Sequence, residues 1–258
     1  MVHILPNPDD AVPADAARPG AARGESRMRC IWPDGRQNRA MTTIERRVAV
    51  PVIAYLVAGS VLVVLSCLLG WWIFSRGEEP FPIDTAWNSF VADWWNPVVA
   101  GFCQVMNFVG GGWVSVLVLP IGGAIGLILL RRPWAAAYFL AAEAVSVAGV
   151  QVLKHAFGRV RPEDILVLSD YGSYPSGHVA NAATIAVAAT VIFPRVWVGV
   201  VGAVWVLLMA FSRTYLHAHW LSDTFGGALL GAGAALLVAA AFALPMAREG
   251  TGAPARRP

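Results

Sequence analysis

The feature that most constrains this chain is a series of apolar segments that match the thickness of a lipid bilayer. A hydrocarbon core of about 30 Å needs about 20 apolar residues in a helix. Segments that reach or approach this length lie at residues 48–74, 113–130, 134–153, 197–211 and 225–246. A sixth, residues 179–193, reaches it if its helix begins near Ser176. Only helices satisfy the backbone within one segment in lipid, so the sequence predicts an all-α membrane bundle with six transmembrane helices.

Composition agrees with a membrane protein and argues against a nucleic-acid partner. Only 14% of the 258 residues are charged and 57% are hydrophobic, whereas a soluble domain carries roughly 25% charged residues. The net charge of +3 arises mainly from arginines that precede the first apolar segment. These arginines form no patch interleaved with aromatic residues, so we expect no binding to nucleic acid.

The placement of arginine predicts the orientation in the membrane. With six spans, the N-terminal arginines, the Arg131–Arg132 turn, Arg195 and the C-terminal arginines all fall on one side. Five or seven spans would place basic clusters on both sides. Because basic loops stay in the cytoplasm, both termini are predicted to be cytoplasmic, in the cell inner or plasma membrane.

The chain divides into three predicted parts. Residues 1–45 are expected to be a disordered cytoplasmic arm, residues 46–246 the membrane domain and residues 247–258 a cytoplasmic tail. Within the domain, residues 76–112 mix tryptophans with acidic residues, which favours an interfacial amphipathic helix. The alternative is that residues 98–109 dip into the membrane, although Asn107 and the three glycines that follow interrupt that run.

Basic residues also occur on the predicted outer side, against the charge bias. Lys154 lies where the third span ends, Arg161 follows seven residues later next to Pro162, and Arg213 closes the fifth span. Seven residues is close to two helical turns, so Lys154 and Arg161 can face one point if the helix persists. Taken singly, Lys154 and Arg213 are explained by snorkelling at helix ends. Together, three cations on one face predict a phosphate-binding site.

A second group, Ser176, Gly177 and His178, opens the predicted fourth span. Ser176 can cap the helix, Gly177 lets an anion approach the backbone, and free N–H groups at a helix N-terminus bind phosphate. His178 can donate or accept a proton. The alternative is an ordinary N-cap followed by an interfacial histidine.

A third group contains His219 and Asp223, four residues apart. If the last helix has begun, the two share a face, and the carboxylate can accept the Nδ1 proton and leave Nε2 as a nucleophile. The alternative is that Asp223 or Ser222 only caps the sixth span. His217 does not share this geometry and is interpreted as a neighbour. Glu143, an acid inside the third span, receives no role.

These groups resemble the three signature motifs of the type 2 phosphatidic acid phosphatase superfamily. The motifs are Lys154 with Arg161-Pro162, Pro175-Ser176-Gly177-His178, and Ser212-Arg213 with His219 and Asp223. They occur complete and in order within residues 154–223, and the six-span layout extends the resemblance to about residues 48–246.

The resemblance implies a lipid phosphatase that forms a phosphohistidine on the outer face of the bilayer. His219 would be the nucleophile, oriented by Asp223, and His178 the general acid and then the base. Lys154, Arg161, Arg213, Ser176 and the Gly177 N–H would bind the phosphate. No cofactor or metal is expected, although His178, His217, His219 and Asp223 could supply zinc ligands if the neighbouring cations did not repel a dication.

The substrate remains open at this stage. A polyprenyl diphosphate is the first expectation, with phosphatidylglycerol phosphate or phosphatidic acid as the alternative. A lipid phosphotransferase and a catalytically silent lipid-binding protein are the competing functions. The sequence does not indicate an oligomeric state.

Overall fold

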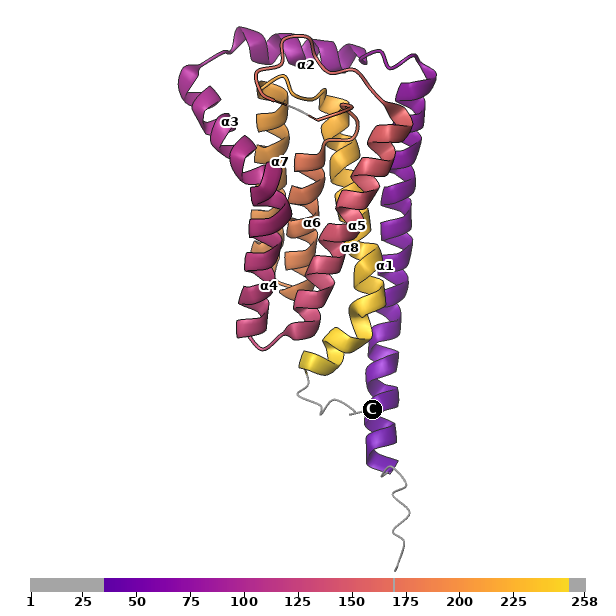
Figure 1. Ribbon diagram of the computed structural model, residues 1–258. Coiled ribbons are helices and arrows are strands. Elements are labelled where there is room, and N and C mark those ends of the chain that lie inside the picture. Colours follow the sequence, from indigo (N-terminus) through magenta and orange to yellow (C-terminus); the bar gives the residue numbers. More distant parts are fainter. Residues whose placement is uncertain (1–34, 169, 251–258) are drawn as a thin grey trace, which may run out of the picture.

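The computed structural model describes residues 35–168 and 170–250, and the regular structure in these ranges is helical (Figure 1). The helices run roughly side by side, except for one that crosses an end of the bundle. In chain order they are α1 (Gly35–Ser75), α2 (Pro82–Asp93), α3 (Pro97–Gly110), the π-helical turn η1 (Val114–Val118), α4 (Leu119–Leu129), α5 (Pro133–Phe157), α6 (Gly177–Ile192), α7 (Val196–Tyr215) and α8 (Leu221–Gly250).

Several helices are long and apolar enough to cross a bilayer. Four segments meet this condition alone: Val48–Ser75, Pro133–Phe157, Val196–Tyr215 and Leu221–Glu249. Pro97–Gly110 and Val114–Leu129 meet it together as a pair bent by 49°. The described part of the chain therefore has four candidate spans, or five with the bent pair. The segment predicted as a further span, α6, has 16 residues and is shorter than the others.

The segment predicted as interfacial, residues 76–112, is divided into two helices. Helix α2 lies across one end of the bundle, as an interfacial helix would (Figure 1). Helix α3 turns down beside α7 and is the first member of the bent pair. The expectation of one interfacial helix therefore describes only the first half of residues 76–112. Asn96 accounts for the division, because its side chain accepts the N–H groups of Val98 and Val99 and caps a new helix that begins at Pro97.

Helix α1 begins before the first apolar segment. The last residues of the predicted arm, 35–45, are helical, while residues 1–34 and the end of the predicted tail lie outside the described residues. Extending an existing helix adds one hydrogen bond for each residue that is fixed, so a polar segment can continue an apolar helix at little cost.

The centre of the bundle is built on small residues. Helix α6 packs against α5, α7 and α8, and α8 also packs along α1. A Cβ atom on Gly227 would lie 2.4 Å from the carbonyl oxygen of Ser176, and one on Gly231 would lie 2.1 Å from that of Ala180. These glycines therefore allow α8 to approach the backbone of α6 closely. Because Ser176 and Gly177 begin α6, this contact also fixes the predicted phosphate-binding turn.

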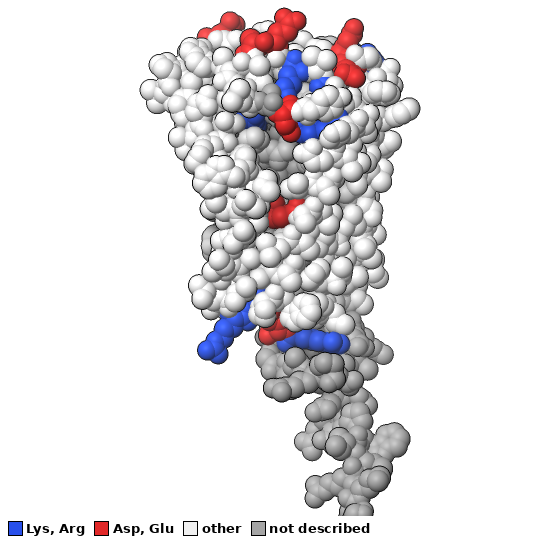
Figure 2. All heavy atoms as spheres, viewed as in Figure 1, with Lys and Arg blue, Asp and Glu red and all other residues white. Residues whose placement is uncertain are grey.

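Charged side chains gather at the two ends of the bundle, and the surface between them is mostly uncharged (Figure 2). Large apolar side chains such as Leu68, Val152 and Leu207 are exposed on the outside of the helices. An apolar belt between two charged ends is the surface expected of a bundle surrounded by lipid.

Candidate active site

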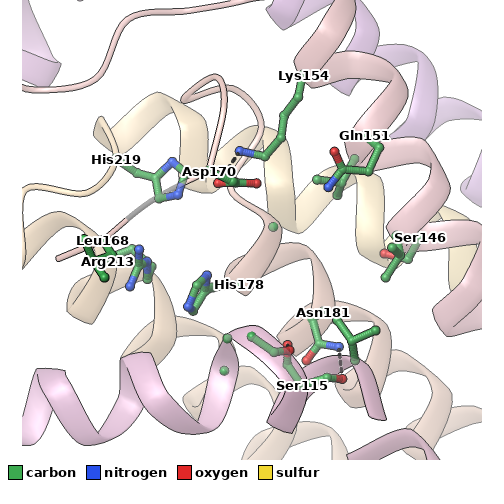
Figure 3. Close-up of a pocket in the computed structure, with 17 residues that line it drawn as sticks. Ser115, Ser146, Gln151, Lys154, Leu168, Asp170, His178, Asn181, Arg213 and His219 are labelled. Carbon is green, nitrogen blue, oxygen red and sulfur yellow. Dashed lines mark hydrogen bonds and ion pairs between the residues drawn. The ribbon is translucent and has the colours of Figure 1, made fainter.

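The predicted site residues come from several elements that meet at the end of the bundle crossed by α2. These elements are the last turn of α5, the following loop, the first turn of α6, the last turn of α7 and the turn before α8. A cavity of about 420 Å³ opens there, lined by Lys154, Gly177, His178, Arg213 and His219 (Figure 3). Five of the predicted site residues, which come from separate parts of the sequence, therefore line one space, whereas Arg161, Ser176 and Asp223 do not line it.

His219 presents an unprotonated ring nitrogen to its surroundings. Its Nδ1 atom lies 2.8 Å from the carbonyl oxygen of Ser173, and 3.7 Å from the nearer carboxylate oxygen of Asp223. A carbonyl oxygen only accepts hydrogen bonds, so Nδ1 carries the proton and Nε2 keeps its lone pair. Burial lowers the pKa of His219 to about 3, against the opposing effect of Asp223, so the ring is neutral near pH 7.

The expectation that Asp223 directly accepts the Nδ1 proton is therefore corrected. The shorter contact belongs to Ser173, a residue that the sequence analysis did not single out. Asp223 contributes from behind, because its Oδ2 atom accepts hydrogen bonds from the Ser173 hydroxyl and from the backbone N–H of Trp220. Asp223 therefore positions Ser173, whose carbonyl oxygen faces Nδ1, and does not itself form the shorter contact with the imidazole of His219.

Arg161 reaches the site by a different route from the one predicted. Helix α5 ends at Phe157, and Gly158 adopts a left-handed conformation with φ 57°, so the helix does not continue from Lys154 to Arg161. Arg161 lies instead in the loop, where Nη1 donates to the carbonyl oxygen of Ala218 at 2.6 Å and lies 3.3 Å from Nε2 of His219. Its guanidinium group therefore faces the unprotonated nitrogen.

Lys154 and Arg161 share one acidic partner, Asp170. The carboxylate lies 3.3 Å from Nζ of Lys154 and 2.8 Å from Nη2 of Arg161. Both cations also donate to the carbonyl oxygen of Gly172. Two of the predicted phosphate ligands thus face the same point and already bind an anion there.

Arg213 and His178 meet at Asn107 in α3. The side-chain oxygen of Asn107 accepts a hydrogen bond from Nη1 of Arg213, and its carbonyl oxygen lies 3.3 Å from Nε2 of His178. A Cβ atom on Gly111 would lie 2.3 Å from that Nε2 atom, so His178 needs a glycine beside it. The glycines at this point, which counted against a membrane-dipping segment at residues 98–109 in the sequence, make room for the histidine.

Ser176 does not cap α6 as expected. Its side chain makes no capping hydrogen bond, and its buried hydroxyl has no hydrogen-bond partner in the described structure. Gly177, the next residue, lines the cavity. The turn therefore keeps one unused hydroxyl donor, that of Ser176, which is buried outside the lining of the cavity.

A buried ion-pair cluster behind the site was not anticipated. Arg159 lies between Asp84 of α2 and Asp223 of α8, at 2.9 Å and 2.6 Å. Arg159 and Asp84 are 75 residues apart, and no helical or strand spacing joins them. Only the charge of Arg159, close to the Arg161-Pro162 pair, gave a signal in the sequence.

A family model of the PAP2 superfamily matches residues 135–245, which include every predicted site residue. The part of the chain that carries the site is therefore similar to this superfamily. The match agrees with the resemblance that the three motifs carry.

Curated relatives of this chain carry different names. Lipid A 1-phosphatase of Rhizobium johnstonii is 31% identical over 43% of this chain and 49% of its own length. Undecaprenyl-diphosphatase of Sulfolobus acidocaldarius is 40% identical over 24% of this chain and 30% of its own. Phosphatidylglycerophosphatase B of Bacillus subtilis is 29% identical over 54% and 70%. The chain therefore spans about half or less of the first two relatives.

Two solved structures share the PAP2 fold of this chain. The transmembrane PAP2-type phosphatidylglycerolphosphate phosphatase of Bacillus subtilis gives a TM-score of 0.61 at 24% identity, covering 70% of this chain and 93% of that one. LpxE of Aquifex aeolicus gives a TM-score of 0.54 at 22% identity, covering 61% and 95%. This likeness supports a multi-pass membrane architecture.

Two other polar residues of the PAP2 domain do not contribute to the site as described. His217 lies with Nδ1 2.7 Å from the carboxylate of Asp164, away from His219. Glu143 is buried in α5 and accepts a hydrogen bond from Asn181 at 2.9 Å. In the ranges that the structure describes, no three His, Cys, Asp or Glu side chains are grouped closely enough to hold a metal ion.

Proposed function

We propose that this protein hydrolyses a lipid phosphate or diphosphate through a phosphohistidine on His219. The observation that carries the proposal is the state of His219: its Nδ1 proton is committed to the Ser173 carbonyl, and its neutral Nε2 faces a cationic site. An imidazole of this kind is ready to attack phosphorus without first losing a proton.

The neighbouring side chains supply the remaining requirements of phosphoryl transfer. Lys154, Arg213 and the Gly177 N–H, which line the cavity, are proposed to bind the phosphate oxygens. Arg161, whose Nη1 atom lies 3.3 Å from Nε2 of His219, and the Ser176 hydroxyl, which has no partner, are proposed to join them. Fixed cations stabilise the charge that spreads over those oxygens in the transition state. Substrate phosphate displaces the Asp170 carboxylate from Lys154 and Arg161.

The reaction proceeds in two steps. Nε2 of His219 bonds to phosphorus while the bond to the leaving oxygen breaks, and His178, in its protonated form, gives that oxygen a proton. His178 then takes a proton from water, the water oxygen attacks phosphorus, and the bond to Nε2 breaks to release inorganic phosphate.

A polyprenyl diphosphate is the proposed substrate, in line with the name of the Sulfolobus relative. Phosphatidylglycerol phosphate, phosphatidic acid and lipid A are the alternatives, the first and last from the names of other relatives. Phosphate release by the purified protein from a panel of these lipids tests the choice. Transfer of labelled phosphate to an added acceptor instead of water would indicate a phosphotransferase.

His219→Ala is the decisive variant in that panel, and His155→Ala is its matched control. His155 is an exposed histidine that does not line the cavity. His219→Ala is expected to remain folded and lose turnover by several orders of magnitude, while His155→Ala retains it. Retained turnover in His219→Ala would overturn the nucleophile, and no release from any lipid would leave a silent lipid-binding protein.

The chemistry is proposed to need no metal ion, because three cations stand where a metal would bind the phosphate. Activity is therefore expected to persist after exhaustive treatment with EDTA. Loss of activity that added magnesium or zinc restores would contradict this.

In the proposed topology, the chain crosses the inner or plasma membrane six times. The short helix α6 counts as a span because it is surrounded by α5, α7 and α8 and follows their direction (Figure 1). The site then lies outside and both termini lie in the cytoplasm, since Arg132 and Arg195 mark the end opposite the site. Cysteine labelling of intact cells at exposed Tyr171 and Trp197, each replaced by Cys, tests the two sides.

A further inference from the structure

The described structure contains a buried ion-pair cluster that the proposed chemistry does not use directly. The guanidinium group of Arg159 and the carboxylates of Asp84 and Asp223 all have fully buried side chains. Removing charges from water is costly, and burial of this kind is tolerated only when each charge is paired and hydrogen-bonded. The cluster therefore needs a reason beyond chance packing.

Asp84 is held by four donors. Its Oδ1 atom accepts the N–H of Ser222, and its Oδ2 atom accepts the hydroxyl of Ser222 at 2.7 Å, the N–H of Phe81 and Nη2 of Arg159. This saturated carboxylate joins the first turn of α2 to the first turn of α8. It also fixes the direction of the Arg159 fork, whose Nη1 atom points at Asp223.

Arg159 reaches His219 through Ser173 by two routes. Its carbonyl oxygen accepts the N–H of Ser173 at 2.7 Å. Its guanidinium group binds Oδ1 of Asp223, which leaves Oδ2 to accept the Ser173 hydroxyl. Ser173 is thus held at both its N–H and its side chain, and its carbonyl oxygen receives Nδ1 of His219.

We propose that Arg159 and Asp84 are positioning residues for the nucleophile: they hold Asp223 and Ser173 so that the Nδ1 proton of His219 is fixed and Nε2 faces the phosphate. This inference rests on the proposed role of His219. Neither residue touches the substrate. Helix α2 therefore helps to position the nucleophile, because it supplies Asp84, the first residue in the series of contacts that leads to His219.

The charges of the cluster support the same role. Two carboxylates flank one guanidinium group, so the cluster carries one surplus negative charge, and the Asp223 carboxylate lies 3.7 Å from Nδ1 of His219. When Nε2 bonds to phosphorus with Nδ1 still protonated, the ring becomes cationic. A fixed negative charge behind the ring stabilises that state more than the neutral ring.

The alternative is that the cluster only clamps α2 onto the bundle. The test uses Asp84→Asn, which keeps the shape and removes the charge, and Arg159→Lys, which keeps the charge and removes the fork. Asp93→Asn is the control, since Asp93 is an exposed acid on the same helix. For each purified protein, kcat, KM and the thermal unfolding midpoint are measured with the best lipid of the panel.

A positioning role predicts that kcat falls about tenfold or more in both variants, while KM changes by less than about threefold. The double variant Arg159→Lys, Asp223→Asn should be no slower than Asp223→Asn alone, because both changes act through one path. Asp93→Asn should match the unaltered protein.

A lower unfolding midpoint with unchanged kcat would show a clamp and overturn the proposal, as would multiplicative losses in the double variant. If Arg159→Lys does not fold, the test rests on the isosteric Asp84→Asn variant, whose kcat should fall about tenfold or more if the proposal is correct. Failure of the underlying function is distinguishable, because it would appear as an active His219→Ala protein.

Discussion

Arginine–carboxylate contacts occur at both ends of the bundle, and they differ in burial and in the number of partners. Beneath α2, Arg159 contacts Asp84 and Asp223 with all three side chains fully buried. At the opposite end, Arg132 lies 3.8 Å from Glu249 and has 28% of its side chain exposed. Exposed pairs contribute about 0–1 kcal/mol, whereas breaking a buried pair costs about 3–5 kcal/mol.

The difference separates two uses of charge in one membrane protein. At the end with Arg132, the arginine side chain is partly exposed to water while that of Glu249 is 7% exposed, and the proposed role of the arginines there is to set orientation. At the end with the cavity, the charges of Arg159, Asp84 and Asp223 are withdrawn from water and bound to one another, and their proposed role is to position a reacting group.

Replacing His178 by Ala should reduce kcat by about 10²- to 10⁴-fold, the range of general acid–base catalysis. The loss should be smaller for a substrate whose leaving group is a good one, such as an aryl phosphate, because that oxygen needs no proton. Steady-state kinetics with a lipid and an aryl phosphate measure the difference. Equal losses with both substrates would show that His178 does not protonate the leaving group.

Replacing Arg213 by Ala should cost about 10²- to 10³-fold in kcat/KM, as removal of one charge-stabilising donor does in other enzymes. The matched substitution at the opposite end, Arg132→Ala, should change kcat/KM by less than about twofold. The two variants are compared for the same lipid in the same detergent. Similar losses of kcat/KM in the two variants would mean that Arg213 contributes to the structure, as Arg132 does, and has no separate role in catalysis.

Acidification should destabilise the protein through His219. The pKa of His219 is about 3 in the folded protein and about 6.5 in the unfolded chain. Between these two pH values, His219 therefore takes up a proton only when the chain is unfolded. Stability should therefore fall as the pH drops below about 6.5, by up to roughly 1.4 kcal/mol per pH unit. Thermal unfolding at pH 7 and pH 5 should show a larger loss for the unaltered protein than for His219→Gln. An equal loss of stability in the two proteins would mean that folding leaves the pKa of His219 at its ordinary value.

Replacing Asp170 by Asn should strengthen inhibition by inorganic phosphate by up to about fivefold. The carboxylate competes for Lys154 and Arg161 but is 59% exposed, so its ion pairs are worth about 1 kcal/mol at most. Asp164→Asn is the control, because Asp164 is equally exposed and faces His217. Weaker inhibition in Asp170→Asn would mean that the carboxylate places the cations instead of competing with the phosphate.

The general fold could be predicted because apolar length is a local property of the sequence. The helical nature of the bundle follows from it. The division of residues 76–112 was weighed only as the less favoured alternative, in which residues 98–109 dip into the membrane. It depends on the cap at Asn96 and on glycines that make room for His178. The length of α6 also differs, because a helix surrounded by other helices is not required to match the full bilayer.

The site shows a similar limit. The motif residues meet as the resemblance implies, but the helical argument that joined Lys154 to Arg161 is wrong, because Gly158 ends α5 between them. The partners Asp84, Asn107, Asp170 and Ser173 could not be predicted. They approach the site from separate elements, and only the folded arrangement brings their polar atoms within hydrogen-bonding distance.

The central claim is tested most directly by trapping the enzyme during turnover. A quench in alkali, in which phosphohistidine is stable, followed by mass spectrometry of the peptide that contains residues 217–223, locates any bound phosphate. The account predicts phosphate on His219 in the active protein and in His155→Ala. Continued release of phosphate with no modified enzyme, or with the modification on a residue other than His219, would contradict it.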